Sequence, residues 1–409
     1  MIRSGAAVIL AMLLGFSGVA AGAPERWVRS WGTALQAPDD PDDYPGADKP
    51  LPAATIRQTL RPTIAGDRIT LRLSNRFGTA ALDFGEVRIA VSRGKGRIDP
   101  GTDRGLTFGG KAALSIAPGG TAQCDPLDFP VKALQELAVT FYLPHGTSGV
   151  LTLHLESRHA TMILPGGDRS AASDLAGASQ SDFKYFLEAL DVGRRDDAGV
   201  IVAFGDSITD GYKSTNEAYR SWPDRLAQHP FSAPMSVINE GISGNRVLLP
   251  VVGPAAVARF EGDALDVPGV RTIVLLEAIN DIWDPDPAHP VGVGAAEIIA
   301  GYRRMIDAAH ARGVRIIGGT LLPDLDPGIE GRHDETVRQE INRWLRDAKA
   351  FDAVVDFDAI FRNPADPARF RPEYDSGDHV HPNDLGYAVM ADAVAAVIAA
   401  HQAGRRAGP

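Results

Sequence analysis

The chain has 409 residues, of which 44% are hydrophobic and 23% are charged, with a net charge of −11 and a single cysteine. This length exceeds one ordinary hydrophobic core, and the hydrophobic content is sufficient for two. The acidic balance argues against a nucleic-acid partner, which would need clustered lysine and arginine, and Cys124 cannot form an intramolecular disulfide. We interpret Cys124 as a structural thiol.

Residues 1–23 are predicted to form a signal peptide. Arg3 supplies the positive charge, Ala6 to Leu14 form the apolar segment, and Ala21-Gly22-Ala23 resembles a cleavage site, with Val19-Ala20-Ala21 as an alternative. A helix needs about 20 apolar residues to span a bilayer, and this apolar segment is shorter than that. We therefore expect a protein that is secreted or periplasmic, without stable membrane insertion after cleavage.

Residues 24–191 have the two-residue period of β-strands. Apolar residues alternate with polar ones along Ile69–Leu73, Leu137–Leu143 and Leu151–Leu155, and glycine-rich turns separate such runs. The pattern predicts an antiparallel β-sandwich or jelly roll in which each strand has one buried and one solvent-facing side. The acidic run Asp39–Asp43 lacks the spaced ligands of a calcium loop, so we interpret it as a solvated turn.

Residues 198–403 follow a polar link and alternate short apolar runs with helical segments, whereas 404–409 form a short tail. This alternation is typical of a three-layer α/β/α domain with a parallel sheet. The five predicted strands are Val200–Phe204, Met235–Asn239, Thr272–Leu276, Val314–Thr320 and Ala353–Phe357. The predicted helices are Ala296–Arg312, one capped by Asp334, and one from Leu385 to about Ala400.

Polar and glycine residues follow the first three strands directly. Ser207 comes after the first strand, Gly244 after the second and Asn280 after the third. A fourth polar segment, Asp375–Asp384, precedes the last helix. Because ligands of open parallel sheets bind at the carboxyl ends of the strands, we expect these four segments to meet at one edge.

A serine nucleophile needs a general base, and a histidine oriented by a carboxylate suits that role near neutral pH. His381 and Asp378 are the predicted pair, because a three-residue offset lets the carboxylate reach Nδ1 and leaves Nε2 for Ser207. His379 and Asp375 are the rival pair. The oxyanion hole is predicted to consist of the backbone N–H groups of Ser207 and Gly244 and the side-chain amide of Asn280. This chemistry needs no metal and no cofactor.

These blocks resemble the SGNH hydrolases, also called the GDSL esterase/lipase family. The matching segments are Gly205-Asp206-Ser207-Ile208, Gly244, Ile279-Asn280-Asp281 and the Asp378-x-x-His381 spacing. The resemblance implies a flavodoxin-like hydrolase domain over about half of the chain, with Ser207 as nucleophile. The complete chain is similar to secreted bacterial members with an N-terminal β-domain. One departure is Ala278, where the family usually has glycine; a positive φ there would strain the alanine.

The sequence therefore predicts a serine esterase that hydrolyses short-chain O-acyl esters, with acetyl groups on carbohydrate as the expected substrate. Arg246 and Trp283 are predicted to line the substrate pocket. The alternatives are a lipase, arylesterase or thioesterase acting on longer or aromatic acyl esters, an acyltransferase, and a glycan-binding protein without catalysis. The expected partner is a small-molecule or glycan ester, and the sequence leaves the oligomeric state open.

Overall fold

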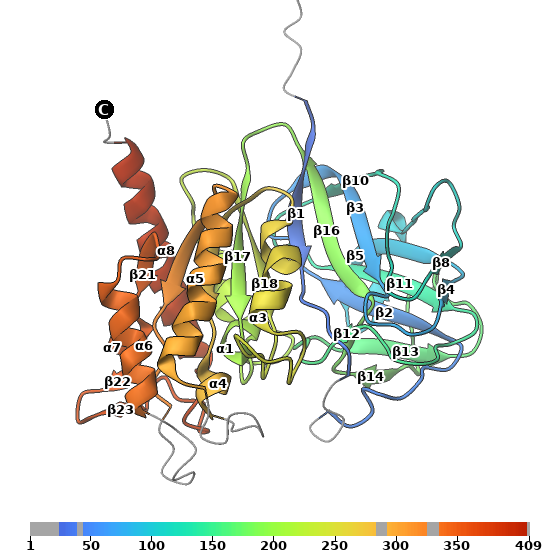
Figure 1. The fold of residues 1–409 in the computed structure, drawn as a ribbon. Coiled ribbons are helices and arrows are strands. Elements are labelled where there is room, and N and C mark those ends of the chain that lie inside the picture. Colours follow the sequence, from blue (N-terminus) through green and yellow to red (C-terminus); the bar gives the residue numbers. More distant parts are fainter. Residues whose placement is uncertain (1–23, 39–43, 284–292, 325–334, 407–409) are drawn as a thin grey trace, which may run out of the picture.

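The computed structural model describes residues 24–38, 44–283, 293–324 and 335–406 (Figure 1). An all-β part comes first in the chain, on the right of Figure 1, and an α/β part follows it on the left. The predicted signal peptide, the acidic run Asp39–Asp43 and the helix cap Asp334 lie outside the described residues. The domain boundaries and these three features stay predictions.

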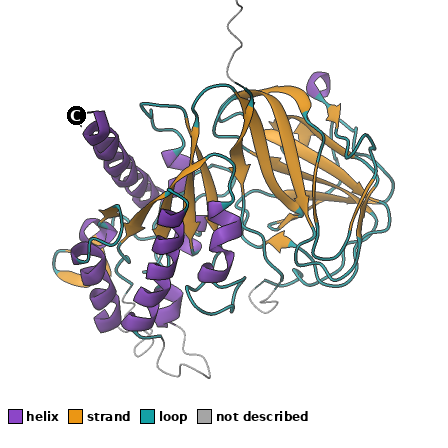
Figure 2. Ribbon diagram, turned by 45° about the horizontal axis from the view of Figure 1, so that its top comes forward, coloured by secondary structure: helices purple, strands orange, loops and turns teal. Residues whose placement is uncertain are grey.

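The all-β part contains two main antiparallel sheets, drawn as orange strands in Figure 2. The first sheet has the order β1 (Arg26–Gly32), β16 (Leu187–Arg194), β3 (Gly66–Ser74) and β10 (Leu127–Val131), with β9 (Thr121–Gln123) also paired to β3. The second has the order β14 (Ser179–Ser181), β13 (Thr161–Pro165), β2 (Ala54–Leu60), β11 (Leu137–Leu143), β5 (Val87–Gly94) and β6 (Arg97–Ile98), with β7 (Arg104–Gly105) paired to β5. Two small pairs and a 3₁₀ turn complete this part: β4 (Leu82–Phe84) with β8 (Leu114–Ile116), β12 (Leu153–His154) with β15 (Lys184–Tyr185), and η1 (Pro100–Thr102).

The inward faces of these strands are predicted correctly. Leu71 of β3 and Val139 of β11 are fully buried, and the ring of Phe141 of β11 lies 6.2 Å from the ring of Phe186, which directly precedes β16. The sheets therefore share one core.

The prediction of solvent-facing outer sides is wrong along all three runs, since Thr70 on β3, Thr140 on β11 and His154 on β12 are buried. Thr140 on the outer side of β11 is buried, because Arg57 donates to its Oγ1 at 2.7 Å and to the carbonyl oxygens of Gly96 and Ala172 in covering loops. Along 151–155 only β12 is a strand, and His154 is 4% exposed because the α/β part covers it. The alternation of apolar and polar residues contains no information about the loops that cover Thr140 or the α/β part that covers His154.

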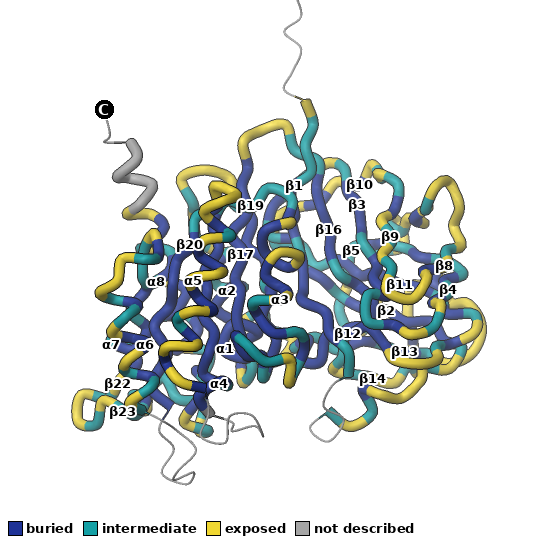
Figure 3. Tube along the Cα trace, viewed as in Figure 1, coloured by how far each residue is buried: buried dark blue, intermediate teal, exposed yellow. Residues whose placement is uncertain are grey.

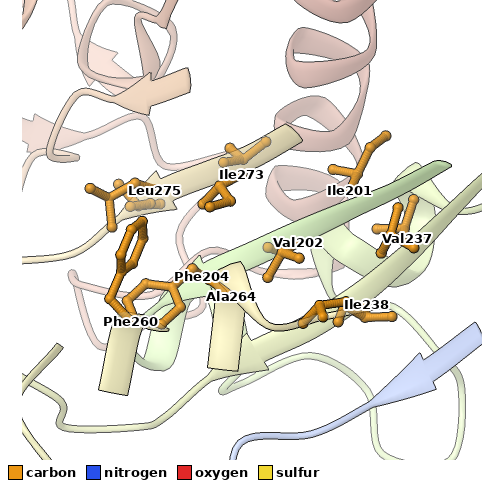
Figure 4. Close-up of a cluster of buried hydrophobic side chains, with 14 of the residues drawn as sticks. Ile201, Val202, Phe204, Val237, Ile238, Phe260, Ala264, Ile273 and Leu275 are labelled. Carbon is orange, nitrogen blue, oxygen red and sulfur yellow. The ribbon is translucent and has the colours of Figure 1, made fainter. Parts of the chain in front are cut away.

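The α/β part is built on a parallel sheet with the order β18 (Met235–Gly241), β17 (Gly199–Gly205), β19 (Val270–Leu276), β20 (Arg315–Gly319) and β21 (Ala353–Val355). This is the doubly wound order of flavodoxin-like folds, so the predicted fold class is confirmed. The sheet interior is apolar, with Ile201, Val202 and Phe204 of β17, which lies between β18 and β19, fully buried (Figure 4). Phe260 packs edge to face on Phe204 at 5.3 Å between ring centroids.

Helices flank this sheet on both sides (Figures 1 and 2). One group packs through α5 (Ala295–Ala311), which contacts both α3 (Ala256–Phe260) and α6 (Glu335–Asp347). In the other group, α2 (Trp222–Leu226) packs on α8 (Asp384–Arg406). The remaining elements are α1 (Ser207–Asp210), the π-helical turn η2 (Glu261–Leu265), α4 (Ile279–Trp283), α7 (Phe357–Phe361) and the hairpin of β22 (Arg362–Asn363) and β23 (Asp366–Phe370). The last predicted strand is two residues too long, since Phe357 begins α7.

The all-β part lies against the edge strand β18. Thr63 Oγ1 lies 2.7 Å from Ser236 Oγ and accepts from Val237 N at 3.0 Å, while Arg29 N donates to Pro268 O at 2.9 Å. Buried residues continue from β1 into β17 and β18 without a break (Figure 3). The contact covers backbone groups of an edge strand that would otherwise be open to pairing.

Candidate active site

Ser207 is held in a tight turn where β17 ends. Asp206 precedes it with an extended backbone and caps α1, because its carboxylate accepts from Ile208 N at 2.9 Å. Gly205 cannot be replaced without moving the backbone, since a Cβ there would lie 2.0 Å from Leu276 O. Ser207 is therefore fixed to the rigid sheet, while its backbone N–H, as the first of a helix, has no intrahelical acceptor.

The structure brings the predicted histidine and aspartate to this serine. Ser207 Oγ lies 2.8 Å from His381 Nε2, and His381 Nδ1 lies 2.9 Å from Asp378 Oδ2. The other carboxylate oxygen of Asp378 accepts from the backbone N–H groups of His381 at 2.9 Å and Val380 at 3.1 Å, and from Ser376 Oγ at 3.0 Å. These bonds orient the carboxylate, so the imidazole presents Nε2 to the serine.

The electrostatics of Asp378 favour a charged carboxylate. Partial burial raises its pKa, but the hydrogen bonds and the charge interaction with His381 outweigh burial and hold the pKa well below its usual range. An ionised Asp378 keeps the proton of His381 on Nδ1, which leaves Nε2 as an acceptor.

The rival pair is assembled separately. His379 Nδ1 lies 2.6 Å from Asp375 Oδ2, and the His379 side chain is 47% exposed. His379 has a φ of 65°. It is not among the residues that line the cavity next to Ser207. Of these two histidines, the geometry therefore gives Ser207 His381 as its neighbour.

The predicted oxyanion donors surround a cavity of about 140 Å³ beside Ser207. Its lining includes Ser207, Gly244, Asn280 and His381. Gly244 has a φ of 80°, which only glycine adopts readily, and a Cβ there would lie 3.0 Å from Val252. Asn280 Nδ2 donates to Asn245 O at 2.8 Å, so the amide is oriented and its second N–H remains for a ligand.

Of the two predicted substrate-binding residues, Arg246 does not line this cavity. Arg246 is 3% exposed. Burial raises the pKa of Asp281 to about 6, although the positive charge of Arg246 acts in the opposite direction. Trp283 is the last residue of α4, and its side chain lies outside the described part of the chain. Their contact with substrate stays a prediction.

Five other described residues line the cavity: Tyr44, Tyr212, Ser243, Ile279 and Val380. The Tyr212 ring packs edge to face on His381, with 4.8 Å between centroids. Tyr212 and Ser243 follow predicted strands, so their position in the sequence already indicated that they lie near the site. Tyr44 comes from the all-β part, and nothing in its sequence context indicates the site.

Arg259 is a buried support that the sequence did not reveal. It donates to Asn245 Oδ1 at 2.9 Å, to Glu240 O at 2.8 Å and to Gly205 O at 2.9 Å. One guanidinium thus joins the ends of β17 and β18 to the loop that carries Asn245, which in turn holds Asn280.

Ala278 has the strained backbone that the departure from the family pattern implies. Its φ is 110° and the residue is fully buried. It precedes Asn280 by two residues, so its backbone sets the direction in which α4 presents that amide.

Among residues 24–38, 44–283, 293–324 and 335–406, no cluster of three or more His, Cys, Asp or Glu side chains is arranged to hold a metal ion. Over the same ranges no helix is both long enough and apolar enough to cross a membrane.

A doubly wound sheet with a serine, histidine and aspartate in hydrogen-bond contact at its strand ends defines a hydrolase fold. Residues 203–389 match the model of the GDSL-like lipase/acylhydrolase family, and this part of the chain is a domain of that family, whose members are esterases or hydrolases. The resemblance drawn from the four sequence blocks is thereby confirmed.

Solved structures similar to this chain include a GDSL-like lipase from Bacteroides thetaiotaomicron, 21% identical, with 51% of this chain and 89% of that chain covered and a TM-score of 0.38. The acetyl xylan esterase AlAXEase is 23% identical, with 48% and 97% covered and a TM-score of 0.37. A member of the lipolytic G-D-S-L family from Veillonella parvula is 23% identical, with 48% and 95% covered and a TM-score of 0.35. No curated protein matches the chain.

Proposed function

We propose that the protein is a secreted serine esterase that hydrolyses short-chain O-acyl esters, with acetyl groups on carbohydrate as the natural substrate class. The observation that carries the proposal is the contact of Ser207 Oγ with His381 Nε2 at 2.8 Å beside a cavity that Gly244 and Asn280 also line. The predicted signal peptide supports secretion, and membership of an acylhydrolase family supports the reaction class.

Acylation begins when Ser207 Oγ attacks the ester carbonyl carbon and passes its proton to His381 Nε2. Asp378 stabilises the resulting imidazolium through Nδ1–H. The carbonyl oxygen becomes an oxyanion that accepts from the N–H groups of Ser207 and Gly244 and from the Asn280 amide. Collapse of this intermediate breaks the bond to the alcohol, which leaves with the proton from His381.

Deacylation repeats these steps with water as nucleophile. His381 Nε2 takes a proton from water, the hydroxide attacks the acyl carbon, and the same donors hold the oxyanion. The carboxylic acid is released and Ser207 Oγ recovers its proton from His381. Every proton that moves is carried by one imidazole, so the cycle needs no further acid or base.

The size of the cavity favours short acyl groups. Its volume is about 140 Å³. A protein cavity of about 150 Å³ holds one benzene molecule, so the two spaces are of similar size. An acetyl or butyryl group fits such a space, whereas a lauroyl chain extends beyond it. Tyr44 and Tyr212 add aromatic surface at the cavity, which suits contact with the apolar face of a sugar.

The test is hydrolysis of p-nitrophenyl esters from acetate to laurate by the mature protein and by Ser207→Ala. We expect activity that depends on Ser207 and peaks at acetate or butyrate. A rate that rises steadily beyond eight carbons would favour the lipase alternative, and undiminished hydrolysis by Ser207→Ala would remove the proposal. Acetate release from acetylated oligosaccharides, with and without a sugar acceptor, separates hydrolysis from acyl transfer.

The two neighbouring histidines provide a matched control. Each is paired with an aspartate, and only His381 contacts Ser207. His381→Ala should lower kcat by about 10⁴-fold, as for loss of a triad member, while His379→Ala should retain kcat within about threefold. The opposite ranking would assign the base to the rival pair.

A further inference from the structure

A histidine of the all-β part lies directly under the turn that carries Ser207. His154 of β12 is 4% exposed, with Nδ1 at 2.9 Å from Ala34 O and Nε2 at 3.1 Å from Asp210 Oδ1. Asp210 is the last residue of α1, the helical turn that begins at Ser207. The two parts of the chain are therefore joined by a buried side-chain contact within one turn of the nucleophile.

The partners of His154 decide where its protons lie. A backbone carbonyl such as Ala34 O can only accept, so Nδ1 carries a hydrogen. A neutral ring would then direct the Nε2 lone pair at the carboxylate of Asp210. The contact is attractive only when a further proton lies between Nε2 and Asp210, as imidazolium with carboxylate or as imidazole with carboxylic acid. This shared proton makes the pair a strong and directional link.

Asp210 extends this link to the oxyanion loop. Its second carboxylate oxygen accepts from Ser243 Oγ at 2.8 Å, and Ser243 directly precedes the oxyanion glycine Gly244. The backbone also packs tightly here, since a Cβ on Gly241 would lie 2.3 Å from Asp210 N. A continuous path of hydrogen bonds thus runs from Ala34 through His154 and Asp210 to the residue before Gly244.

The same segment of the all-β part contacts the other side of the site. Arg158 lies over the Tyr212 ring, 5.3 Å from its centroid, and Tyr212 packs on His381. Arg158 also forms an ion pair with Glu156. Residues 154–158 therefore touch both the nucleophile turn and the aromatic neighbour of the catalytic histidine.

We propose that His154 is a positioning residue: through Asp210 and Ser243 it fixes the Gly244 N–H in the oxyanion hole, so that the all-β part completes the active site. This inference rests on the proposed esterase function. A cavity separate from that beside Ser207 lies at His154, and the charged and titratable groups that line it are Arg61, Arg158, His159, Lys184, Asp210, Tyr219 and Asp224. Asp210 is the one hydrogen-bonded to the His154 ring.

The first test is a double-mutant cycle on a serine-dependent ester substrate. His154→Phe and Ser243→Ala should each lower kcat by about 10-fold to 100-fold with KM within about threefold, as for a disturbed oxyanion donor. Because both changes break one path, the double variant should be no slower than His154→Phe alone. Additive losses, or an unchanged kcat in His154→Phe, would overturn the inference.

Two further variants separate positioning from loss of fold. Asp210→Asn can donate to a neutral His154 and accept from Ser243, so it should retain kcat within about threefold. Thr63→Val removes a hydrogen bond of the same interface at Ser236, far along β18, and should lower thermal stability without lowering kcat. If Thr63→Val slows turnover as much as His154→Phe, general docking explains the effect and the inference is wrong.

Hydrogen exchange provides a readout that does not depend on activity. His154→Phe should accelerate exchange in the segment Gly241–Asn245 by about 10-fold or more, whereas Thr63→Val should leave that segment unchanged. Unchanged exchange there in His154→Phe contradicts the positioning role even if the protein proves not to be an esterase. Absence of Ser207-dependent hydrolysis, in contrast, contradicts the proposed function alone.

Discussion

Replacement of Ala278 by glycine tests whether backbone strain is stored beside the oxyanion amide. Ala278 has a φ of 110° and is fully buried between the end of β19 and the start of α4. An L-residue in such a conformation costs about 1–3 kcal/mol. Glycine releases that strain. Glycine also removes a buried methyl group, which lowers the free energy of unfolding by about 0.8 kcal/mol. It makes the unfolded chain more flexible as well, which lowers the free energy of unfolding by about 0.4–1 kcal/mol.

These contributions nearly cancel. The free energy of unfolding of Ala278→Gly should lie between about 1 kcal/mol below and about 2 kcal/mol above that of the wild type, with a centre near 0.5 kcal/mol of stabilisation. Ala203→Gly in β17 is a matched control, because Ala203 is equally buried but has extended backbone. It should lose about 1.2–1.8 kcal/mol with no strain to release.

Urea denaturation of both variants measures the strain as their difference, which should be about 1–3 kcal/mol. Turnover of Ala278→Gly should be preserved or modestly raised, since glycine keeps the same φ and leaves Asn280 in place. Equal destabilisation of the two variants would refute the strain argument. A fall in turnover of more than about tenfold would show that the alanine methyl group itself shapes the site.

Three other outcomes follow from single residues. Burial raises the pKa of Asp206 from its ordinary value of 3.8 to about 7. Between these two pH values the folded state retains a proton that the unfolded state releases, so the free energy of unfolding falls as pH rises from about 4 to about 7. Asp206→Asn keeps the cap on Ile208 and should raise the urea midpoint at about pH 8 but not below about pH 4; an equal shift at both would contradict this. Tyr44→Ala removes a wall of the cavity and should raise KM for acetate and butyrate esters several-fold with kcat nearly constant; unchanged kinetics would exclude Tyr44 from substrate contact. Cys124 is buried, with its pKa raised to about 11 by burial, so a thiol reagent should label it only after unfolding; rapid labelling of the native protein would contradict its placement in the core.

The sequence predicted the parallel sheet well because its strands are buried on both faces. Such strands are continuous apolar runs with sharp ends, and the prediction Val200–Phe204 differs from β17 by one residue at each end. Ser207 was placed at the site for the same reason: the ends of parallel strands meet at one edge, so polar residues there lie together whatever the loops do. Asp378 and His381 were instead proposed from their three-residue spacing before the last helix, and the structure places His381 beside Ser207.

The sequence could not predict contacts that depend on how the two parts of the chain pack. The alternation along 151–155 is correct for the leucines, but it placed His154 in solvent because it contains no information about a second layer. Tyr44 reaches the cavity and Arg259 joins strand ends through tertiary contacts between distant segments. Periodicity records which side of a strand is apolar, whereas these side chains are buried polar groups with specific partners.

The most direct test of the account is to trap the acyl-enzyme. The wild-type protein and Ser207→Ala would be acid-quenched during turnover of p-nitrophenyl acetate, digested, and mapped by mass spectrometry. The account predicts one acetyl group on the peptide that contains Ser207 in the wild type, and neither acetylation of that peptide nor hydrolysis above background in the variant. Hydrolysis at the wild-type rate by Ser207→Ala, or acetylation of another residue that accounts for turnover, would contradict the assignment of Ser207 as nucleophile.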